Sequence, residues 1–302
     1  MGKVKNVLFT ALFGTAAAAS FLLGDDAYRK YIRENRERRG ASAGDEETAQ
    51  EEWEMDGLDN TKLYAALYLP DAEAETHDYI LLLRDMESEP DSIQPLLSHY
   101  REKGMRVLVP DPRGCGKSTG RYLGYGYDDR LDVIGWIHRI LHTDPKAKIA
   151  LHGMGTGAAA ALLAGAEYLP GAVYATIADS SYTTLTEYLQ NRMRREEGTL
   201  LPAEIRLVFL RIVTRIKAGF DIGDASPLKA VEKTNVPTLF VHGDEDRVTP
   251  VDMSRTLYRR AGCTRQIGIY LGAGHLQSMT LCAERYFGQT DSFLAKQHPD
   301  RL

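Results

Sequence analysis

Cysteine is scarce in this sequence, and internal repeats and low-complexity tracts are absent. The 302 residues include three cysteines, an odd number, which lie far apart at Cys115, Cys263 and Cys282. This pattern excludes a disulfide framework and a metal site of clustered cysteines, so we predict no metal and no cofactor. The formal net charge of -5 gives no reason to expect nucleic acid as a partner.

The length and composition limit the domain organisation. A chain of 302 residues is long enough for one large α/β domain with an appendage, and too short for two such domains. Hydrophobic residues make up 43% of the chain and charged residues 26%, as in ordinary soluble globular proteins. We therefore predict a single globular domain and look for its limits in the pattern along the chain.

Residues 1–24 differ from the rest because they contain an uncharged apolar run from Val7 to Leu23. At about 1.5 Å per residue, a helix of this length crosses most of a hydrocarbon core of roughly 30 Å. We predict a single-pass membrane anchor, with a cleaved signal peptide or a soluble helix as alternatives. The segment Ala16–Ala18 resembles a cleavage site, but Phe21–Leu23 continues the run beyond it. More positive charge follows the run than precedes it, which favours a cytoplasmic globular part.

Residues 25–59 form a charged segment in two halves. The first half is basic and helix-prone, and the second is acidic, with seven carboxylates between Asp45 and Asp56. Runs of this kind are usually solvated spacers. We therefore predict a linker over residues 25–59 and a globular domain over residues 60–302.

The pattern after residue 60 alternates between short apolar runs and helical stretches, which predicts an α/β fold. Parallel strands joined by helical crossovers give a sheet that is mostly parallel and covered on both faces. Residues 183–224 interrupt the alternation, because they are arginine-rich, helical in pattern and strandless, and we expect a small helical cap there. Strands are predicted at Lys62–Leu69, Tyr79–Leu83, Met105–Pro110, Lys148–His152, Val173–Ala178, Val236–His242 and Gln266–Leu271.

The loops that follow the strands are where ligands bind in open α/β sheets. The strand Lys148–His152 runs into Gly153-Met154-Gly155-Thr156-Gly157 and then into an alanine-rich helix. A strand, a turn bounded by glycines and a helix are the setting of a nucleophile elbow, G-x-S-x-G. The central residue here is Gly155, which has no side chain with which to attack a carbonyl.

An acid and a histidine follow the last two predicted strands. Asp246 comes after Val236–His242, and His275 comes after Gln266–Leu271. The chain order of elbow, acid and histidine is the order of a hydrolytic triad on this kind of sheet. We therefore expect Asp246, His275 and Gly155 to meet at the carboxyl ends of the strands.

Four motifs in this order give the chain its resemblance to a known family. Residues Asp111–Ser118 are similar to a D-x-R-G-x-G-x-S turn, and Ile177–Thr183 is similar to the strand end beside an elbow. Gly243–Pro250 and Gly272–His275 are similar to the acid and histidine motifs. Over residues 60–297 the chain resembles α/β-hydrolases of the serine aminopeptidase and monoacylglycerol lipase type, close to bacterial membrane-anchored members. The resemblance implies an α/β-hydrolase fold in which Asp246 and His275 are the acid and the base.

The departures from the family lie at the centre of the site. The family's serine falls on Gly155, and its His-Gly pair, which supplies an oxyanion donor, falls on Arg84-Asp85. An anion at Asp85 opposes a developing oxyanion, while the backbone N–H of Thr156 remains as one donor. The expected pocket residues are Thr156, Met154, Arg84, Asp85, Ser180 and Ser181, and the loss of a serine side chain slightly enlarges the pocket floor.

The sequence leaves more than one function open. The first is a catalytically impaired pseudohydrolase that binds an unknown small molecule or partner protein. The second is an active ester or peptide hydrolase that uses Ser180, Ser181 or Thr156 as a substitute nucleophile, or a water activated by Asp246 and His275. The third is a membrane-associated scaffold with an inert pocket.

Overall fold

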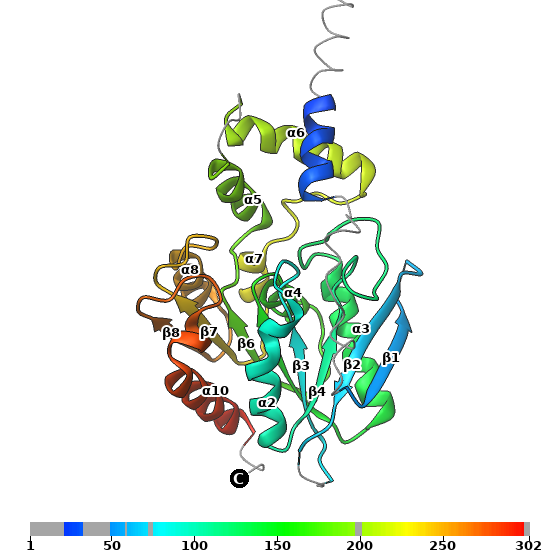
Figure 1. Ribbon diagram of the computed structural model, residues 1–302, viewed down its shortest axis with the longest axis vertical. Coiled ribbons are helices and arrows are strands. Elements are labelled where there is room, and N and C mark those ends of the chain that lie inside the picture. Colours follow the sequence, from blue (N-terminus) through cyan, green and yellow to red (C-terminus); the bar gives the residue numbers. More distant parts are fainter. Residues whose placement is uncertain (1–20, 33–48, 58, 72–74, 197–200, 299–302) are drawn as a thin grey trace, which may run out of the picture.

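The computed structural model describes residues 21–32, 49–57, 59–71, 75–196 and 201–298 (Figure 1). The strands are β1 Glu51–Asp56, β2 Lys62–Tyr68, β3 Asp78–Leu83, β4 Arg106–Pro110, β5 Lys148–Met154, β6 Val173–Asp179, β7 Thr238–Gly243 and β8 Arg265–Tyr270. The helices are η3 Pro90–Ile93, α2 Gln94–Glu102, α3 Asp129–Thr143, α4 Thr156–Ala164, α5 Leu185–Arg194, α6 Ala203–Lys217, α7 Pro227–Val231, α8 Asp252–Arg260, α9 Ser278–Leu281 and α10 Ala283–Gln297. Residues 21–31 form a further helix ahead of these, which we call the N-terminal helix.

The strands form one twisted sheet in the order β1-β2-β4-β3-β5-β6-β7-β8. From β4 to β8 all neighbouring strands are parallel, and only β2 runs antiparallel to its neighbours β1 and β4. Each strand predicted after residue 60 is found to within two residues of its expected bounds. The prediction of a mostly parallel α/β sheet is confirmed.

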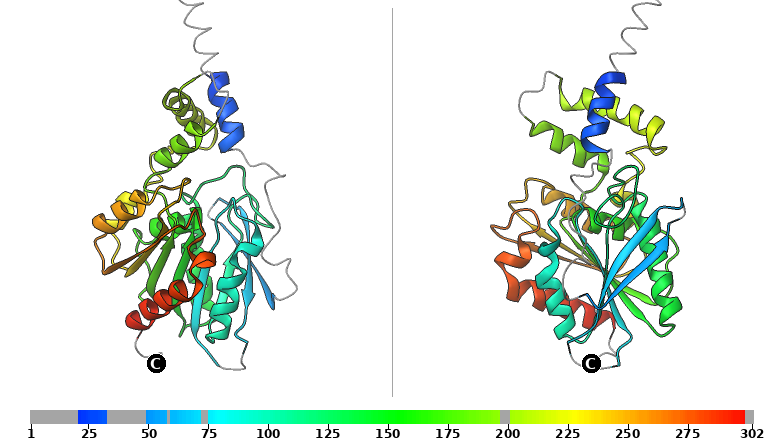
Figure 2. Two further views of the ribbon diagram at one scale, coloured as in Figure 1. Left: turned by 60° about the vertical axis from the view of Figure 1, so that its left-hand side comes forward. Right: turned by 45° about the vertical axis from the view of Figure 1, so that its right-hand side comes forward.

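Helices cover both faces of the sheet, as Figure 2 shows. On one face α2 and α10 bury Leu96 and Phe293 against the strands. On the other face α3 and α4 form a core that includes Trp136, and α7 and α8 extend it over β7. Because both faces are buried, the central strands are continuous apolar runs, which is why the sequence predicted them well.

The cap lies over the carboxyl ends of the parallel strands (Figure 1). The chain leaves the sheet at the end of β6, and α5 begins at Leu185, where the side chain of Thr184 accepts a hydrogen bond from the Glu187 N–H. Leu189 of α5 and Leu207, Leu210 and Val213 of α6 form a separate hydrophobic core. This cap core also contains residues of the N-terminal helix.

The prediction of a solvated linker at residues 25–59 is wrong in two places. Tyr28 and Tyr31 of the N-terminal helix, and Ile32 directly after it, are buried in the cap core. Glu51–Asp56 form β1, an edge strand paired with β2, in which Trp53 is buried. In both segments apolar residues recur at the spacing of a helix or a strand, and burial of those residues outweighs the charged composition around them.

The predicted membrane anchor at residues 1–24 falls outside the described residues except at its end. Within the part of the chain that the structure describes, no helix combines the length and the apolar character needed to cross a membrane.

Candidate active site

The turn between β5 and α4 has the geometry of a nucleophile elbow. Gly155 has φ 54° and ψ -115°, in the left-handed half of backbone space that residues with side chains rarely adopt. Gly153 and Gly157, the outer glycines of the turn, are needed because other backbone segments pack too closely against them for a side chain to fit. A Cβ atom on Gly153 would lie 2.4 Å from the Cα of Ala158, and one on Gly157 would lie 2.1 Å from the carbonyl oxygen of Leu83. The strand, turn and helix are therefore built like a working elbow, with glycine where the nucleophile stands.

The carboxylate of Asp85 fills the space at the centre of this turn. A Cβ atom on Gly155 would lie 2.6 Å from Asp85 Oδ1, closer than real Cβ contacts allow. The same oxygen accepts hydrogen bonds from the backbone N–H of Thr156 at 2.9 Å and from its hydroxyl at 2.7 Å. Asp85 Oδ2 accepts from the N–H of Glu87 and the hydroxyl of Ser88. Two expectations are thus corrected: the Thr156 N–H is not an open oxyanion donor, and the pocket floor is filled rather than enlarged.

This placement of Asp85 is stable for a simple physical reason. The first N–H groups of a helix lack partners within the helix and carry partial positive charge. Gly155 has no side chain to cap α4, and Asp85 supplies a carboxylate from the loop after β3 instead. The side chain therefore serves as a cap for α4 at the position where an oxyanion would otherwise bind.

Asp246 and His275 are brought together as their chain order predicts. His275 Nδ1 donates to Asp246 Oδ2 at 2.7 Å, which leaves Nε2 as the ring nitrogen for proton transfer. The Asp246 side chain is fully buried, whereas that of His275 is 19% exposed. The acid and the histidine thus have the mutual arrangement that a triad requires.

The charges around this pair shift both pKa values. Burial alone would raise the pKa of Asp246, but hydrogen bonds from His242 and His275 outweigh it and hold that pKa well below its ordinary value. Burial alone would lower the pKa of His275, but the hydrogen bond and charge of Asp246, with the charge of Asp85, raise it. Both shifts favour the charged forms of the pair, the carboxylate of Asp246 and the imidazolium of His275.

The raised pKa of His275 predicts a pH-dependent contribution to stability. Its pKa in the folded protein is above the unfolded value of about 6.5, so the stabilisation is fully present below about pH 6.5 and is lost as pH rises through the folded value. We expect the stability difference between the native protein and His275→Gln to be larger at acidic than at alkaline pH. Urea unfolding of both proteins on the two sides of the transition measures this. A difference that grows with pH would contradict the prediction.

Comparison with solved structures decides the fold. An esterase of Pyrococcus furiosus, Pf2001, superposes with a TM-score of 0.66 at 20% identity, over 82% of this chain and 92% of that one. Est1E of Butyrivibrio proteoclasticus, with ferulic acid bound, gives 0.62 at 19% identity over 81% and 98% of the chains. The α/β hydrolase GrgF of a Penicillium species gives 0.61 at 18% identity over 82% and 98%. The chain has the α/β-hydrolase fold.

Sequence comparison adds one similar protein to these structural neighbours. The uncharacterized protein YqkD of Bacillus subtilis is 29% identical over 197 residues, which are 65% of this chain. The match covers 64% of YqkD, so this chain spans less than two thirds of that relative's length. No family model matches the chain.

The three expected substitute nucleophiles in this hydrolase fold donate their hydroxyl protons elsewhere. Thr156 donates to Asp85, as described above. Ser180 donates to Asp179 Oδ1 at 2.9 Å, and Ser181 donates to the carbonyl oxygen of Tyr182 at 3.2 Å. All three are buried. Their hydrogen bonds do not direct any of these hydroxyls to His275.

Two residues of the site escaped the sequence analysis. The hydroxyl of Thr249 lies 3.2 Å from His275 Nδ1, on the side of the ring that faces Asp246, and 2.8 Å from Asp246 Oδ2. His242 lies in the interior, where Nε2 donates to the Thr249 carbonyl and Nδ1 pairs with the hydroxyl of Ser254. The position of His242 at the end of a predicted strand beside Asp246 was the available signal, but its inward orientation depends on the fold.

Besides Asp85, the carboxyl of Asp179 also lies beside the elbow. Asp179 ends β6, is completely buried, and accepts hydrogen bonds from Ser180 and Tyr286. Its backbone carbonyl accepts the N–H of Gly155 at 2.8 Å. Burial raises the pKa of Asp179, which favours the protonated acid. Asp179 thus connects the elbow, through its backbone carbonyl, to α10, through its carboxyl and the Tyr286 hydroxyl.

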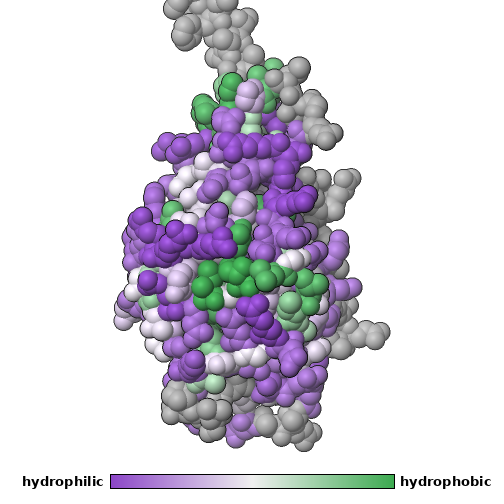
Figure 3. Space-filling model, turned by 90° about the vertical axis from the view of Figure 1, so that its left-hand side faces the viewer, coloured by the Kyte–Doolittle hydropathy of each residue, from purple (hydrophilic) through white to green (hydrophobic). Residues whose placement is uncertain are grey.

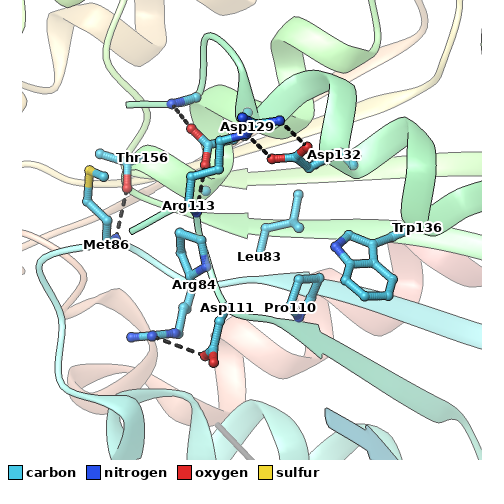
Figure 4. A pocket seen from close by; sticks show the side chains of 15 residues that line it. Leu83, Arg84, Met86, Pro110, Asp111, Arg113, Asp129, Asp132, Trp136 and Thr156 are labelled. Atoms are coloured by element: carbon cyan, nitrogen blue, oxygen red, sulfur yellow. Dashed lines mark hydrogen bonds and ion pairs between the residues drawn. The ribbon is translucent and has the colours of Figure 1, made fainter. Parts of the chain in front are cut away.

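Arg84 points away from the expected oxyanion position. Its buried guanidinium reaches Asp111 Oδ1 at 3.3 Å, as Figure 4 shows. Leu83, Trp136 and Thr156 help to line a cavity of about 40 Å³ beside the elbow. Figure 4 shows their side chains. A volume of this size suits one or two water molecules rather than a substrate. On its far side Arg113 binds Asp132 through two hydrogen bonds, which fixes the D-x-R-G turn.

Proposed function

We propose that this protein is a pseudohydrolase, an α/β-hydrolase fold that binds a small molecule or a partner without cleaving it. The observation that carries the proposal is the Asp85 carboxylate, which occupies both the volume of a nucleophile side chain and the hydrogen bond from the Thr156 N–H. Glycine at position 155 prevents formation of an acyl-enzyme. Asp85 prevents stabilisation of an oxyanion even for a nucleophile that comes from solution.

The Asp246–His275 pair favours one alternative, hydrolysis by an activated water. That route needs a neutral His275 and a hydrogen-bond donor for the oxyanion. The negative charge of Asp85 at the Thr156 N–H opposes the second condition, because it occupies the donor that the oxyanion needs. Binding without turnover is therefore the stronger of the two functions.

The surface beside the site suits a ligand that is partly apolar. Leu271 and Leu281 lie on either side of the His275 loop in the sequence and are 73% and 57% exposed. Figure 3 shows a band of hydrophobic residues across the side of the molecule that carries β8, α8 and α10. An apolar surface next to a polar site whose oxyanion position is filled by Asp85 favours recognition of an acyl-bearing molecule or an apolar protein segment.

Chemical labelling tests the absence of turnover. We expect a fluorophosphonate probe to leave the native protein unlabelled, and esterase and peptidase panels to show no turnover that depends on His275. A ligand that binds the native state should nevertheless raise the melting temperature, since binding to the folded form alone stabilises it. Stoichiometric labelling at Ser180, Ser181 or Thr156, or ester hydrolysis that is abolished by His275→Gln, would refute the proposal.

We also propose that residues 1–24 attach the protein to a membrane as a single-pass anchor. The support is the uncharged run from Val7 to Leu23, whose length matches most of a hydrocarbon core. The larger number of basic residues after the run favours a globular domain on the cytoplasmic side.

A further inference from the structure

Helix α6 carries apolar side chains on two faces, and only one of them is covered. Leu207, Leu210 and Val213 are buried in the cap core. On the opposite side four large apolar residues are between 43% and 66% exposed, namely Ile205, Val208, Ile212 and Ile216. Their spacing of three and four residues aligns them on one face of the helix. An exposed stripe of this kind on a surface helix is typical of a face that contacts a membrane or a partner.

The N-terminal helix presents a second apolar group beside this face. Phe21, Leu22 and Leu23 are between 43% and 67% exposed. The ammonium of Lys217, at the end of α6, lies 5.7 Å from the centre of the Phe21 ring and forms an ion pair with Asp25. We call the four residues of α6 together with residues 21–23 the cap face. Figure 3 shows hydrophobic residues at the end of the molecule that the cap forms.

The N-terminal helix is held firmly against α6. A Cβ atom on Gly24 would lie 2.6 Å from Val213 Cγ2 and 2.7 Å from the carbonyl oxygen of Phe209, so the two helices cross in close contact at this glycine. Farther along, the Tyr125 hydroxyl donates to the Tyr31 carbonyl at 2.8 Å. The exposed residues 21–23 therefore lie directly before the point at which the N-terminal helix crosses α6.

Basic residues accompany the apolar stripe on α6. Arg211 and Arg215 are 54% and 75% exposed, and both lie near a single carboxylate, that of Asp221. Two guanidinium groups that share one carboxylate leave net positive charge on this helix. Apolar residues combined with arginine on one exposed helix are characteristic of helices that lie in the interface of an anionic bilayer.

We propose that the cap face docks on the surface of an anionic lipid bilayer, with α6 lying in the interface and the carboxyl ends of the strands facing the membrane. The proposal goes beyond the pseudohydrolase function and does not depend on whether residues 1–24 span the bilayer. A second copy of the chain is the competing occupant of the same face. A measurement of contact between lipid acyl chains and α6 distinguishes docking on a bilayer from binding of a second copy.

Tryptophan quenching in the full chain tests the docking. The native Trp53 and Trp136 are buried in the main domain, so a tryptophan placed in the cap reports separately. We expect Val208→Trp emission to be lost on vesicles that contain brominated phosphatidylcholine and phosphatidylglycerol, with a smaller loss on phosphatidylcholine alone. The control is Tyr168→Trp, at a side chain that is 98% exposed beyond the end of α4, and its emission should not change.

Charge reversal in the Val208→Trp protein tests the anionic preference. We expect Arg211→Glu combined with Arg215→Glu to reduce the quenching of the introduced tryptophan on phosphatidylglycerol vesicles to the level seen on phosphatidylcholine alone. Flotation of the same samples reports vesicle attachment independently. Protein that floats with the vesicles while the tryptophan in α6 stays unquenched would refute docking and leave the anchor proposal intact. Concentration-dependent dimerisation in solution that shields the same tryptophan would also refute docking, in favour of a second copy.

Discussion

Gly155→Ser combined with Asp85→Gly is expected to react with a fluorophosphonate probe at position 155, whereas neither single substitution is. The serine alone would place its Cβ atom 2.6 Å from Asp85 Oδ1, and the Thr156 N–H would still be occupied. Asp85→Gly alone opens that N–H but provides no nucleophile. Only the double variant has a hydroxyl, a free oxyanion donor and the Asp246–His275 pair together.

The size of the effect follows from the oxyanion donor. Loss of one such donor lowers kcat by about 10²–10³-fold in a serine hydrolase. We therefore expect ester hydrolysis by the double variant to exceed that of Gly155→Ser by at least about 10²-fold. The effects of the two substitutions on the free energy of unfolding should also be non-additive, because the serine side chain clashes with the Asp85 carboxylate and Asp85→Gly removes that clash. Unfolding free energies of the four proteins give this coupling.

The matched control is the double variant with His275→Gln added, which keeps the new serine but removes its base. Labelling at position 155 should then fall sharply while the fold is retained. Equal labelling of Gly155→Ser and the double variant would show that Asp85 does not block the site. A folded double variant that neither labels nor hydrolyses would show that the remaining frame is disabled elsewhere.

The elbow could be predicted from sequence because its causes are local. Gly153 meets the nearby backbone of Gly157 and Ala158, and although Gly157 meets the distant Leu83, the spacing of the two glycines around Gly155 indicates the turn. The acid and histidine were likewise predicted from their places after consecutive strands. The role of Asp85 could not be predicted, because its carboxylate reaches Thr156 from the loop after a different strand, and charge alone indicated repulsion rather than a cap.

Two further failures have the same origin in tertiary contacts. The charged composition of residues 25–59 concealed Trp53 and Tyr31, which become buried only because β2 and the cap offer surfaces to cover them. The sequence also did not reveal which residues form hydrogen bonds with Asp246. Thr249 is only three residues from Asp246 in the sequence, and its hydroxyl donates to the carboxylate. The contact between His242 and Asp246 depends on the direction in which the His242 side chain points at the end of β7.

Asp246→Ala is expected to lower the free energy of unfolding by about 3–5 kcal/mol, although the protein is proposed to have no catalysis to lose. The buried carboxylate accepts hydrogen bonds from the N–H groups of Val248 and Thr249, from the Thr249 hydroxyl and from His275. It also lies 3.1 Å from His242 Nε2. Removal of the carboxylate leaves these donors unsatisfied in the interior. Urea unfolding at neutral pH measures the change.

The exposed neighbour Glu245 provides the matched control, since Glu245→Ala should change stability by less than about 0.5 kcal/mol. Asp246→Asn should be intermediate, because its remaining oxygen can still accept from the two backbone N–H groups while its amide nitrogen cannot accept from His275 or Thr249. This ranking explains how an acid and a histidine persist beside a glycine elbow: the acid holds the loops after β7 and β8 together. If Asp246→Ala were as stable as Glu245→Ala, the pair would be a remnant of lost catalysis without a structural role.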